Sequence, residues 1–599
     1  MKKIIEFTKR NDIGNLLGWR DFRLKIFLEG IIVGCFVGLI VVLFRLLVEK
    51  AELLRQYTYQ MPQALSFEGI AIRFVMLIFI AWLISEILRM NPLTSGSGIP
   101  QVKGYIQGQI KVGWAKLLVF KFIGTALSIG AGLSLGREGP TVQMGASVGQ
   151  GISKLLGRLR MEEKYLVTSG VAAGLAAAFN APLAGAMFAM EEVHKSFSPA
   201  VLMSAMAASL TSDFVMRQFF GAEVIIGFKE VPLLPLKYYG LLIGLGIFCG
   251  LAGVVYSKTL LKTNKMYDSL VKRVNFLPKR WIPVIPLLFA GILGFCCPQV
   301  LGGGEGLVNS LDDGTYGLKV LIILLIVKFL FTMMSAASGA PGGIFFPMLV
   351  LGALVGSIYA NIIVMINANT SDYVLNFVVF AMAAFFTAVV KAPITGSILI
   401  MEMTGSIEHL LPLIMVSMFA YIVSDILKCR PIYDDLYVLM IAGTKKKSKK
   451  KYKKKYYPDQ IIDKEKNIVD IPKIENSKNT KMQMIIESTD DVILDKNEKV
   501  EFVSSKKSKT NSENKRKTII EQIVCMGSRI EEKRVKDINW PQGCLIVSIR
   551  NGEEDVIPEG NTIIMTGDNL YVLVDQDEEY EMKVMLEELC GERYGQKIY

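Results

Sequence analysis

Apolar residues dominate the chain up to about residue 445, after which a polar tail begins. Several apolar runs, such as 26–44, reach the length needed to cross a hydrocarbon core of about 30 Å. Other apolar runs are shorter or are interrupted by Gly and Pro, so they cannot cross it as straight helices. The pattern predicts an all-α, multi-pass membrane domain over residues 1–440.

The apolar region contains the same pattern twice. PTVQMGASVG, from Pro140, corresponds to PMLVLGALVG, from Pro347. Further along, APLAGAMFAMEE from Ala181 corresponds to APITGSILIMEM from Ala392. These matches predict an internal duplication, with halves at roughly 27–220 and 235–440. Repeated halves with short, Gly/Pro-interrupted apolar segments indicate a transporter whose site lies between broken helices.

The tail divides into two parts. Nine of the eleven residues 445–455 are lysine, so we interpret 441–516 as a flexible cytosolic linker that can touch anionic lipid. Alternating apolar residues return in 517–599 and predict a small cytosolic α+β domain. Lys and Arg also recur through the first residues of the chain. Both termini are therefore expected on the cytoplasmic side of the cell membrane.

Composition narrows the function. The chain is 51% hydrophobic with a mean hydropathy of +0.39, which excludes an ordinary soluble protein. Eight cysteines without paired spacing and two histidines indicate no metal site and no cofactor. The segment Ile519–Tyr599 holds 8 basic and 17 acidic residues, so no nucleic-acid partner is expected. We predict no enzymatic activity.

The sequence GREGP places Glu138 inside an apolar region. A buried carboxylate is costly unless it is paired or lines a wet path, so Glu138 is a candidate functional residue. Gly139 and Pro140 suit the first turn of a helix, whose free N–H groups would form an anion site. The alternative is a tight turn with Arg137 and Glu138 at the water interface.

Two further breaks add candidate ligands for an anion. NPLTSGSGIPQVKG contains Ser97, a neutral hydroxyl donor, in either an ordinary loop or a re-entrant turn. SGAPGGIFFP precedes the second helix start, which places the N–H groups of Ile344 and Phe345 toward Glu138. Packing in the core is the alternative role for Phe345 and Phe346.

Two other polar positions each allow two interpretations. Glu191 and Glu192 end an apolar run, so they are either solvated at a membrane edge or include a proton-handling carboxylate. Tyr433 is either an interfacial anchor or another uncharged donor.

Three motifs together, GSGIP at 96–100, GREGP at 136–140 and GIFFP at 343–347, resemble the anion-site signatures of the CLC chloride channel and transporter family. The resemblance covers roughly residues 20–440. It implies an inverted repeat and a homodimer with one pore per subunit. Fluoride exporters of the family differ at the Ser97 and Tyr433 positions, and Ser97 favours chloride over nitrate.

The resemblance also implies roles for individual residues. Ser97 and, on a shorter match, Tyr433 resemble the hydroxyl ligands of chloride. Glu138 resembles the external gating carboxylate, and Glu192 resembles the internal proton-transfer glutamate. Ile344 and Phe345 resemble the backbone donors of the same site. These roles imply a chloride/proton antiporter, with a passive gated chloride channel as the alternative.

The tail resembles the TrkA-C (RCK-C) regulatory domain in its segments WPQGCLIVSIRNG and VIPEGNTIIMTGDNLYVL. Such domains dimerise and often bind small molecules. We therefore expect a dimer-interface pocket for a small nucleotide such as cyclic di-AMP. Its candidate residues are Ile546, Val547, Ile549 and Arg550. A purely structural dimer clamp is the alternative.

Overall fold

The computed structural model divides into two compact units, Met1–Met440 and Ile441–Tyr599. The residues that it describes are 2–61, 66–158, 160–195, 197–221, 226–228, 231–274, 278–312, 316–441, 517–524, 528–541, 543–551, 554–565, 567–575 and 578–590. The predicted linker at 441–516 lies outside the described residues except for Ile441.

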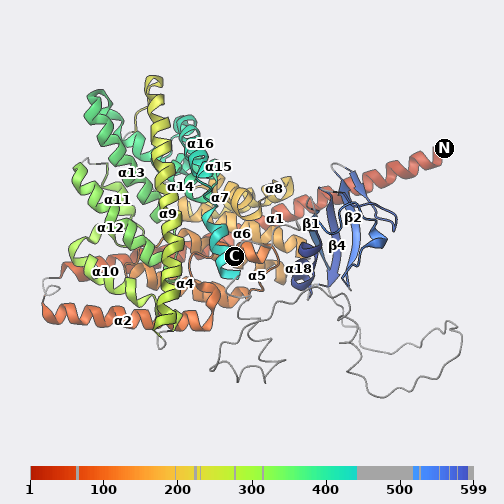
Figure 1. Ribbon diagram of the computed structural model, residues 1–599, viewed down its shortest axis with the longest axis horizontal. Coiled ribbons are helices and arrows are strands. Elements are labelled where there is room, and N and C mark those ends of the chain that lie inside the picture. Colours follow the sequence, from red (N-terminus) through yellow and green to blue (C-terminus); the bar gives the residue numbers. More distant parts are fainter. Residues whose placement is uncertain are drawn as a thin grey trace, which may run out of the picture. The chain divides into compact units, whose positions relative to one another are not determined.

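The membrane unit consists of helices of very different lengths (Figure 1). The helices of its first half are α1 (Lys2–Gln60), α2 (Phe67–Met90), α3 (Ile99–Ile106), α4 (Trp114–Gly130), α5 (Glu138–Leu155), α6 (Arg160–Phe179), α7 (Pro182–Phe188), the π-helical turn η3 (Ala189–His194) and α8 (Pro199–Phe220). The helices of its second half are α9 (Tyr239–Arg273), α10 (Val284–Cys296), α11 (Glu305–Asn309), α12 (Leu318–Ala337), α13 (Phe345–Ile366), α14 (Val374–Val390), α15 (Pro393–Thr404), α16 (Leu410–Ile426) and a final helix over residues 432–441.

The two halves contain helices in the same order, as expected for an internal duplication. A short 3-10 turn precedes α3 at Pro92–Thr94 and precedes α11 at Pro298–Val300. Both α3 and α11 then follow a glycine in the left-handed region, Gly98 at φ 93° and Gly304 at φ 100°. Glycine is required there because a Cβ atom disfavours positive φ.

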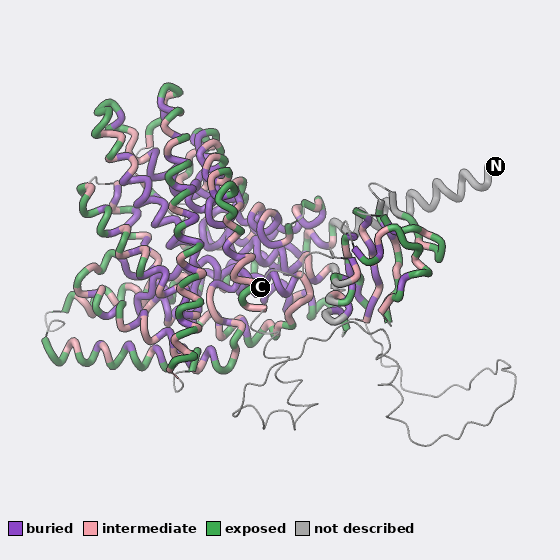
Figure 2. Tube along the Cα trace, viewed as in Figure 1, coloured by how far each residue is buried: buried purple, intermediate pink, exposed green. Residues whose placement is uncertain are grey.

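The helices of the membrane unit differ in how far they are buried (Figure 2). Among the described residues, nine helices are long and apolar enough to cross a membrane. In the segment that contains α14, 83% of the most apolar 18-residue stretch is buried. In α2, the corresponding share is 33%. On α2, exposed apolar side chains include Ile72, Val75 and Phe79. Such a surface is suited to lipid, so the chain is a multi-pass membrane protein.

The tail is a small α+β domain, as predicted. Its sheet has the order β1-β4-β2-β3 and is antiparallel throughout. The strands are β1 (Lys517–Ile523), β2 (Leu545–Asn551), β3 (Glu554–Val556) and β4 (Asn569–Asp575). Side chains of β4 alternate between buried and half-buried positions, so one face of the sheet forms a core with α18 (Glu579–Cys590).

Candidate functional site

Three of the loops that the sequence singled out meet at Gly139, in the first turn of α5. A Cβ atom on Gly139 would lie 2.8 Å from the Ser97 carbonyl oxygen and 3.2 Å from the Cα atom of Gly343. Glycine therefore allows the loop before α3 and the loop before α13 to approach α5 closely. The structure brings the GSGIP, GREGP and GIFFP segments to one place.

The helices α5 and α13 begin at a shared backbone bridge. The Gly136 N–H donates to the Gly343 carbonyl at 2.7 Å, and the Gly343 N–H donates to the Gly136 carbonyl at 2.7 Å. The two segments run antiparallel at this bridge. An antiparallel meeting of equivalent segments agrees with an inverted repeat.

Glu138 lies at this junction and is 1% exposed. Its Oε2 atom accepts a hydrogen bond from the backbone N–H of Phe346 at 3.3 Å. The Phe346 N–H belongs to the first turn of α13, where backbone donors lack partners within the helix and favour an anion. The carboxylate of Glu138 therefore occupies a place that suits a small anion. The interface turn considered above is wrong, because Glu138 is buried.

Ile344 and Phe345 stand at the start of the same helix. The first hydrogen bond of α13 runs from the Met348 N–H to the Ile344 carbonyl at 3.2 Å. The N–H groups of Ile344 and Phe345 come before that bond, so the helix itself does not use them. The Phe345 ring packs against Phe179 and Phe386, with centroid distances of 5.1 and 4.6 Å. Phe345 thus combines core packing with a helix-start donor.

Ser97 and Tyr433 are buried hydroxyl donors, 6% and 0% exposed. Neither hydroxyl has a hydrogen-bond partner within the described part of the chain. Leaving a buried polar group without a partner costs about 1–3 kcal/mol. Each of these donors is therefore available to a bound anion. The interfacial-anchor interpretation of Tyr433 is wrong, because its side chain is fully buried.

The loop that carries Ser97 is held by a buried lysine on α4. The Nζ atom of Lys121 donates to the Thr94 carbonyl at 2.9 Å and to the Gly96 carbonyl at 2.6 Å. The second half repeats this contact, since Lys328 Nζ donates to the carbonyls of Val300 and Gly302 at 2.9 and 3.0 Å. Each lysine satisfies carbonyls that the loop leaves unpaired.

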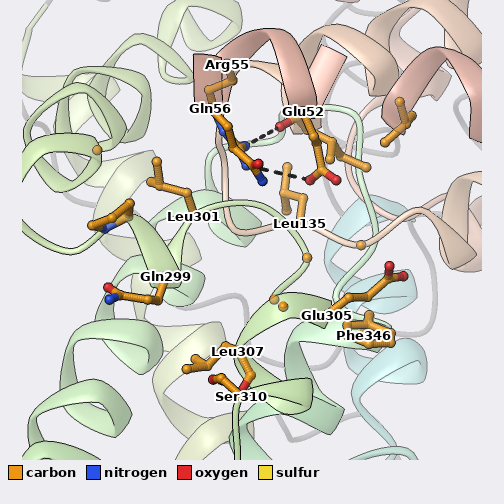
Figure 3. A pocket seen from close by; sticks show the side chains of 18 of the residues that line it. Glu52, Arg55, Gln56, Leu135, Gln299, Leu301, Glu305, Leu307, Ser310 and Phe346 are labelled. Atoms are coloured by element: carbon orange, nitrogen blue, oxygen red, sulfur yellow. Dashed lines mark hydrogen bonds and ion pairs between the residues drawn. The ribbon is translucent and has the colours of Figure 1, made fainter. Parts of the chain in front are cut away.

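A cavity of about 560 Å³ opens beside Glu138 (Figure 3). Its lining includes Arg137, Glu138, Phe346 and charged side chains from α1 and α11. The guanidinium of Arg137 binds the carboxylate of Glu305 at 2.6 Å. Across the cavity, Arg55 pairs with Glu52 at 3.8 Å. The cavity therefore places charged side chains beside Glu138, and its cations are paired with carboxylates.

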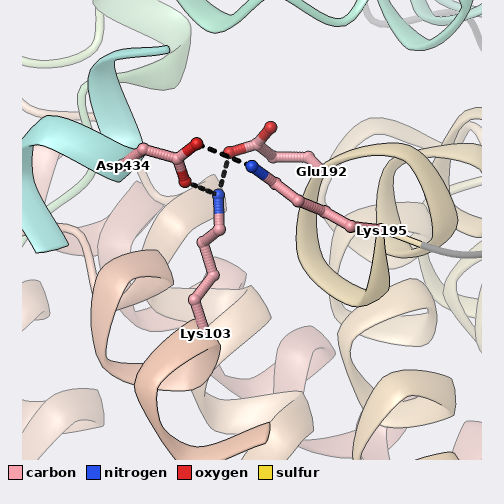
Figure 4. A network of polar contacts seen from close by, with 4 residues as sticks. All are labelled: Lys103, Glu192, Lys195 and Asp434. Carbon is pink, nitrogen blue, oxygen red and sulfur yellow. Dashed lines mark hydrogen bonds and ion pairs between the residues drawn. The ribbon is translucent and has the colours of Figure 1, made fainter. Parts of the chain in front are cut away.

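A second buried carboxylate, Glu192, belongs to a network of four charges (Figure 4). Lys103 Nζ donates to Glu192 Oε1 at 2.7 Å and also binds the carboxylate of Asp434. Lys195 Nζ reaches the other oxygen of Asp434 at 2.6 Å. Two cations and two anions make the cluster neutral, which lowers the cost of burying charge.

Glu191 and Glu192 are neighbours with different surroundings. Glu191 accepts from the Thr395 N–H at 2.8 Å and from its hydroxyl at 2.7 Å, at the start of α15. Glu192 is 3% exposed. Of the two interpretations, a solvated pair at a membrane edge does not fit, because Glu192 is buried and both carboxylates bind protein groups.

Comparisons with known proteins agree with this geometry. Residues 76–425 match the family model described as voltage gated chloride channel. The chain belongs to this family. The H(+)/Cl(-) exchange transporter ClcA of Vibrio cholerae (strain M66-2) is 37% identical over 358 residues, 58% of this chain and 75% of that protein. The Salmonella newport ClcA exchanger is 30% identical over 447 residues, 74% of this chain and 94% of that protein.

Solved structures of the voltage gated chloride channel family have the same fold. A slow cyanobacterial Cl-/H+ antiporter matches with a TM-score of 0.66 and 29% identity, covering 70% of this chain and 98% of that one. A eukaryotic CLC transporter matches with a TM-score of 0.59 at 22% identity, covering 70% of this chain and 74% of that one. The predicted fold class is confirmed.

Residues 521–586 match the TrkA-C domain model, which confirms the second resemblance. The candidate ligand residues lie on β2 but do not share one face. Ile549 is 2% exposed and belongs to the core, whereas Val547 is 38% exposed. Arg550 is exposed, and its guanidinium lies 5.3 Å from the centroid of the Tyr571 ring. A β-bulge between Ile546 and Ser548 changes the alternation at this point.

Three charged residues that the structure places beside Glu138 and Glu192 were not identified from the sequence. Lys103 and Asp434 contact the network of Glu192, and Glu305 binds Arg137. A signal was present for Lys103, because a lysine inside GSGIPQVKG is a charge in an apolar region that requires a partner. Asp434 and Glu305 belong to polar loops or helix ends, where a charge by itself indicates little.

Proposed function

We propose that this protein exchanges chloride for protons across the cell membrane. The observation that carries the proposal is the hydrogen bond from the Phe346 N–H to Glu138. A carboxylate at an anion site competes with chloride for the same donors while it is ionised. Protonation removes its charge and weakens its hold, so binding of chloride and release of Glu138 become linked.

Ser97, Tyr433, Ile344 and Phe345 are the proposed chloride ligands. Two of them offer buried hydroxyls, and two offer N–H groups at the start of α13. Neutral donors suit a transported anion, since a full positive charge would hold chloride too strongly for release. Ser97 also supports chloride as the preferred anion over nitrate.

Glu192 is the proposed proton donor and acceptor at the other end of the path. It is buried, and it reaches partly exposed groups through Lys103, Asp434 and Lys195. A protein with two separated buried carboxylates can take up a proton at one and release it at the other. The proton path then runs from Glu192 to Glu138.

A passive gated chloride channel of the same fold is the alternative. Purified protein in sealed vesicles separates the two functions. A chloride gradient imposed across the vesicles should drive protons uphill in the opposite sense, measured with a pH electrode. Chloride flux with no proton movement would establish the channel.

For the tail we propose regulation by a small anionic nucleotide, most plausibly cyclic di-AMP, bound between two tails of a homodimer. Val547 and Arg550 offer apolar surface and positive charge on β2, and Ile546 and Ile549 belong to the same strand. In this proposal both termini of the chain lie on the cytoplasmic side of the membrane, and the protein catalyses no reaction. A purely structural dimer clamp is the alternative for the tail.

The test of the tail is calorimetry with cyclic di-AMP on the full-length protein, followed by chloride flux on full-length protein and on protein truncated after Lys445. Binding together with a nucleotide response that the truncation removes supports regulation. Absence of binding, or an unchanged response after truncation, supports the clamp.

A further inference from the structure

Lys103 is shared by two carboxylates that belong to different parts of the membrane unit. It binds Glu192 of the η3 turn at 2.7 Å and also binds Asp434 of the 432–441 helix. Its side chain is 1% exposed, and that of Glu192 is 4% exposed. A buried ammonium between two carboxylates responds strongly to the charge of either one, because water does not screen the contact.

The exposure of the network is graded. Side chains of Asp434 and Lys195 are 33% and 44% exposed, in contrast to those of Lys103 and Glu192. The cluster is therefore exposed to solvent at Asp434 and shielded from solvent at Glu192. A proton that arrives on Glu192 changes the charge balance at the shielded end, where the effect on Lys103 is largest.

Asp434 and Lys103 each lie in a chain segment that carries a proposed chloride ligand. Asp434 directly follows Tyr433, whose hydroxyl is fully buried. Lys103 itself belongs to α3, which begins just after Ser97. A change in the Lys103–Asp434 contact therefore acts on the chain segments that carry the two hydroxyl donors.

Other titratable side chains next to the network have partners of their own. These contacts are Glu191 with Thr395, His194 with Thr168, and Tyr105 with Glu163. Asp435 follows Asp434 in the same helix but takes no part in the contacts of Lys103 and Lys195. Within the described residues, the charge on Glu192 is thus opposed directly by Lys103.

We propose that Lys103 and Asp434 are positioning residues that couple the protonation of Glu192 to the place of the Tyr433 hydroxyl. The inference rests on the proposed function, in which Glu192 exchanges protons and Tyr433 binds chloride. When Glu192 is ionised, Lys103 divides its hydrogen bonds between two carboxylates. When Glu192 takes up a proton, its charge is lost, and Lys103 binds Asp434 without competition.

The sign of the coupling follows. An undivided Lys103–Asp434 pair holds the start of the 432–441 helix against α3, which keeps the hydroxyls of Tyr433 and Ser97 on the same anion. Chloride then binds more tightly when Glu192 is protonated. By reciprocity, chloride beside Tyr433 favours the proton on Glu192.

The test measures chloride affinity by calorimetry at pH 5 and pH 8 on full-length protein that carries Glu138→Gln. This parent variant removes the titration of the other carboxylate. We expect its chloride affinity to be higher at pH 5 by about fivefold or more, which is a typical coupling between two sites. Adding Asp434→Asn to the parent should reduce the ratio of the chloride affinities at pH 5 and pH 8 to about twofold. The difference that remains is the direct effect of the Glu192 charge on chloride.

Three further variants distinguish a loss of coupling from a general loss of structure. Asp435→Asn is the matched control and should keep the ratio of the parent. Asp434→Glu should restore most of it, since it restores the carboxylate. Tyr433→Phe should lower the ratio as Asp434→Asn does, and the two changes together should lower it no further, because they act on one link.

The proposal is overturned if the parent shows no pH dependence, if Asp434→Asn and Asp435→Asn behave alike, or if the effects of Asp434→Asn and Tyr433→Phe add. Failure of the proposed chloride/proton exchange would be seen in a different experiment, as chloride flux without proton movement in vesicles that contain the wild-type protein. The affinity measurement does not depend on that result, since a channel with this network would show the same coupling.

Discussion

Glu191 caps α15, the helix that contains Glu402, and Glu402 caps α7, the helix that directly precedes Glu191. The carboxylate of Glu191 accepts from the Thr395 N–H at 2.8 Å at the start of α15, the helix of Glu402. The carboxylate of Glu402 accepts from the N–H groups of Leu183 and Ala184 at 3.0 and 2.8 Å, at the start of α7, which leads to Glu191. The two halves of the repeat therefore exchange their helix caps.

This exchange predicts a loss of stability when a cap is weakened. Glu402→Gln retains the shape of the side chain but removes the charge that the helix start favours. We expect a loss of about 1 kcal/mol, as for other helix caps, and a fall of about 2 °C in the apparent melting temperature in detergent. Glu408→Gln is the control, because Glu408 is exposed in the same region. Equal melting temperatures for the two variants would contradict the capping role.

Glu138→Gln should abolish proton movement and leave passive chloride flux. The amide cannot ionise, so it neither carries the proton nor competes as an anion for the Phe346 N–H. Chloride flux in the wild type should rise as the external pH falls, since protonation frees the same donors, and flux in Glu138→Gln should be independent of external pH. Parallel chloride and pH electrode traces on vesicles provide the measurement. Persistent uphill proton uptake would exclude Glu138 as the gate.

Glu192→Gln should retain chloride movement and lose proton movement. The amide can still accept a hydrogen bond from Lys103, so the contact at 2.7 Å is weakened and the fold is kept. The same vesicle assay applies, with Glu191→Gln as a neighbouring control that should remain coupled. If Glu192→Gln pumped protons against a gradient, the carboxylate would serve only to balance Lys103.

Ser97→Pro should shift the anion preference from chloride toward nitrate. The change removes the hydroxyl donor that is buried without a partner among the described residues. Ser97→Ala removes the same hydroxyl without altering the backbone, so the pair separates the two effects. Competition between nitrate and chloride in flux or calorimetry provides the ranking. An unchanged ranking in both variants would show that Ser97 does not contact the anion.

Glu305→Gln should strengthen the apparent affinity for external chloride. The variant removes the carboxylate that neutralises Arg137 at 2.6 Å in the cavity beside Glu138. Because the Glu305 side chain is 40% exposed, water screens the pair, and we expect a change of about two- to fivefold. The effect should shrink as ionic strength rises. Weaker affinity would mean that the ion pair holds Arg137 in place for chloride.

The sequence predicted most of the fold because the duplicated motifs leave a direct trace in it. Pro140 and Pro347, and the paired Ala-Pro segments, mark helix starts that the structure places in equivalent positions. Ser97, Glu138 and Phe345 could be grouped from the motifs by resemblance. Their approach through Gly139 could not be derived, because it depends on two backbone segments far apart in the sequence.

Long-range pairing explains what the sequence did not predict. The local sequence pattern could not distinguish Glu191 from Glu192, yet the partner of Glu191, Thr395, belongs to the second half of the repeat. Lys103 and Asp434 are separated by more than three hundred residues. His409 is 1% exposed and packs on Phe380, a position that its polar side chain does not predict. Local pattern identifies a charged residue in an apolar region, whereas only the fold identifies the group that neutralises it.

The reciprocal hydrogen bonds between Gly136 and Gly343 join the starts of α5 and α13 directly. A Cβ atom on Gly343 would lie 3.0 Å from the Gly139 nitrogen, so the joint has no slack for sliding. The halves cannot swing apart as rigid bodies without breaking both bonds, unlike transporters in which one repeat rocks against the other. Movement is left to side chains and to segments outside this joint, such as the start of the 432–441 helix. With the halves joined in this way, cross-linking them at their periphery should leave the transport rate intact.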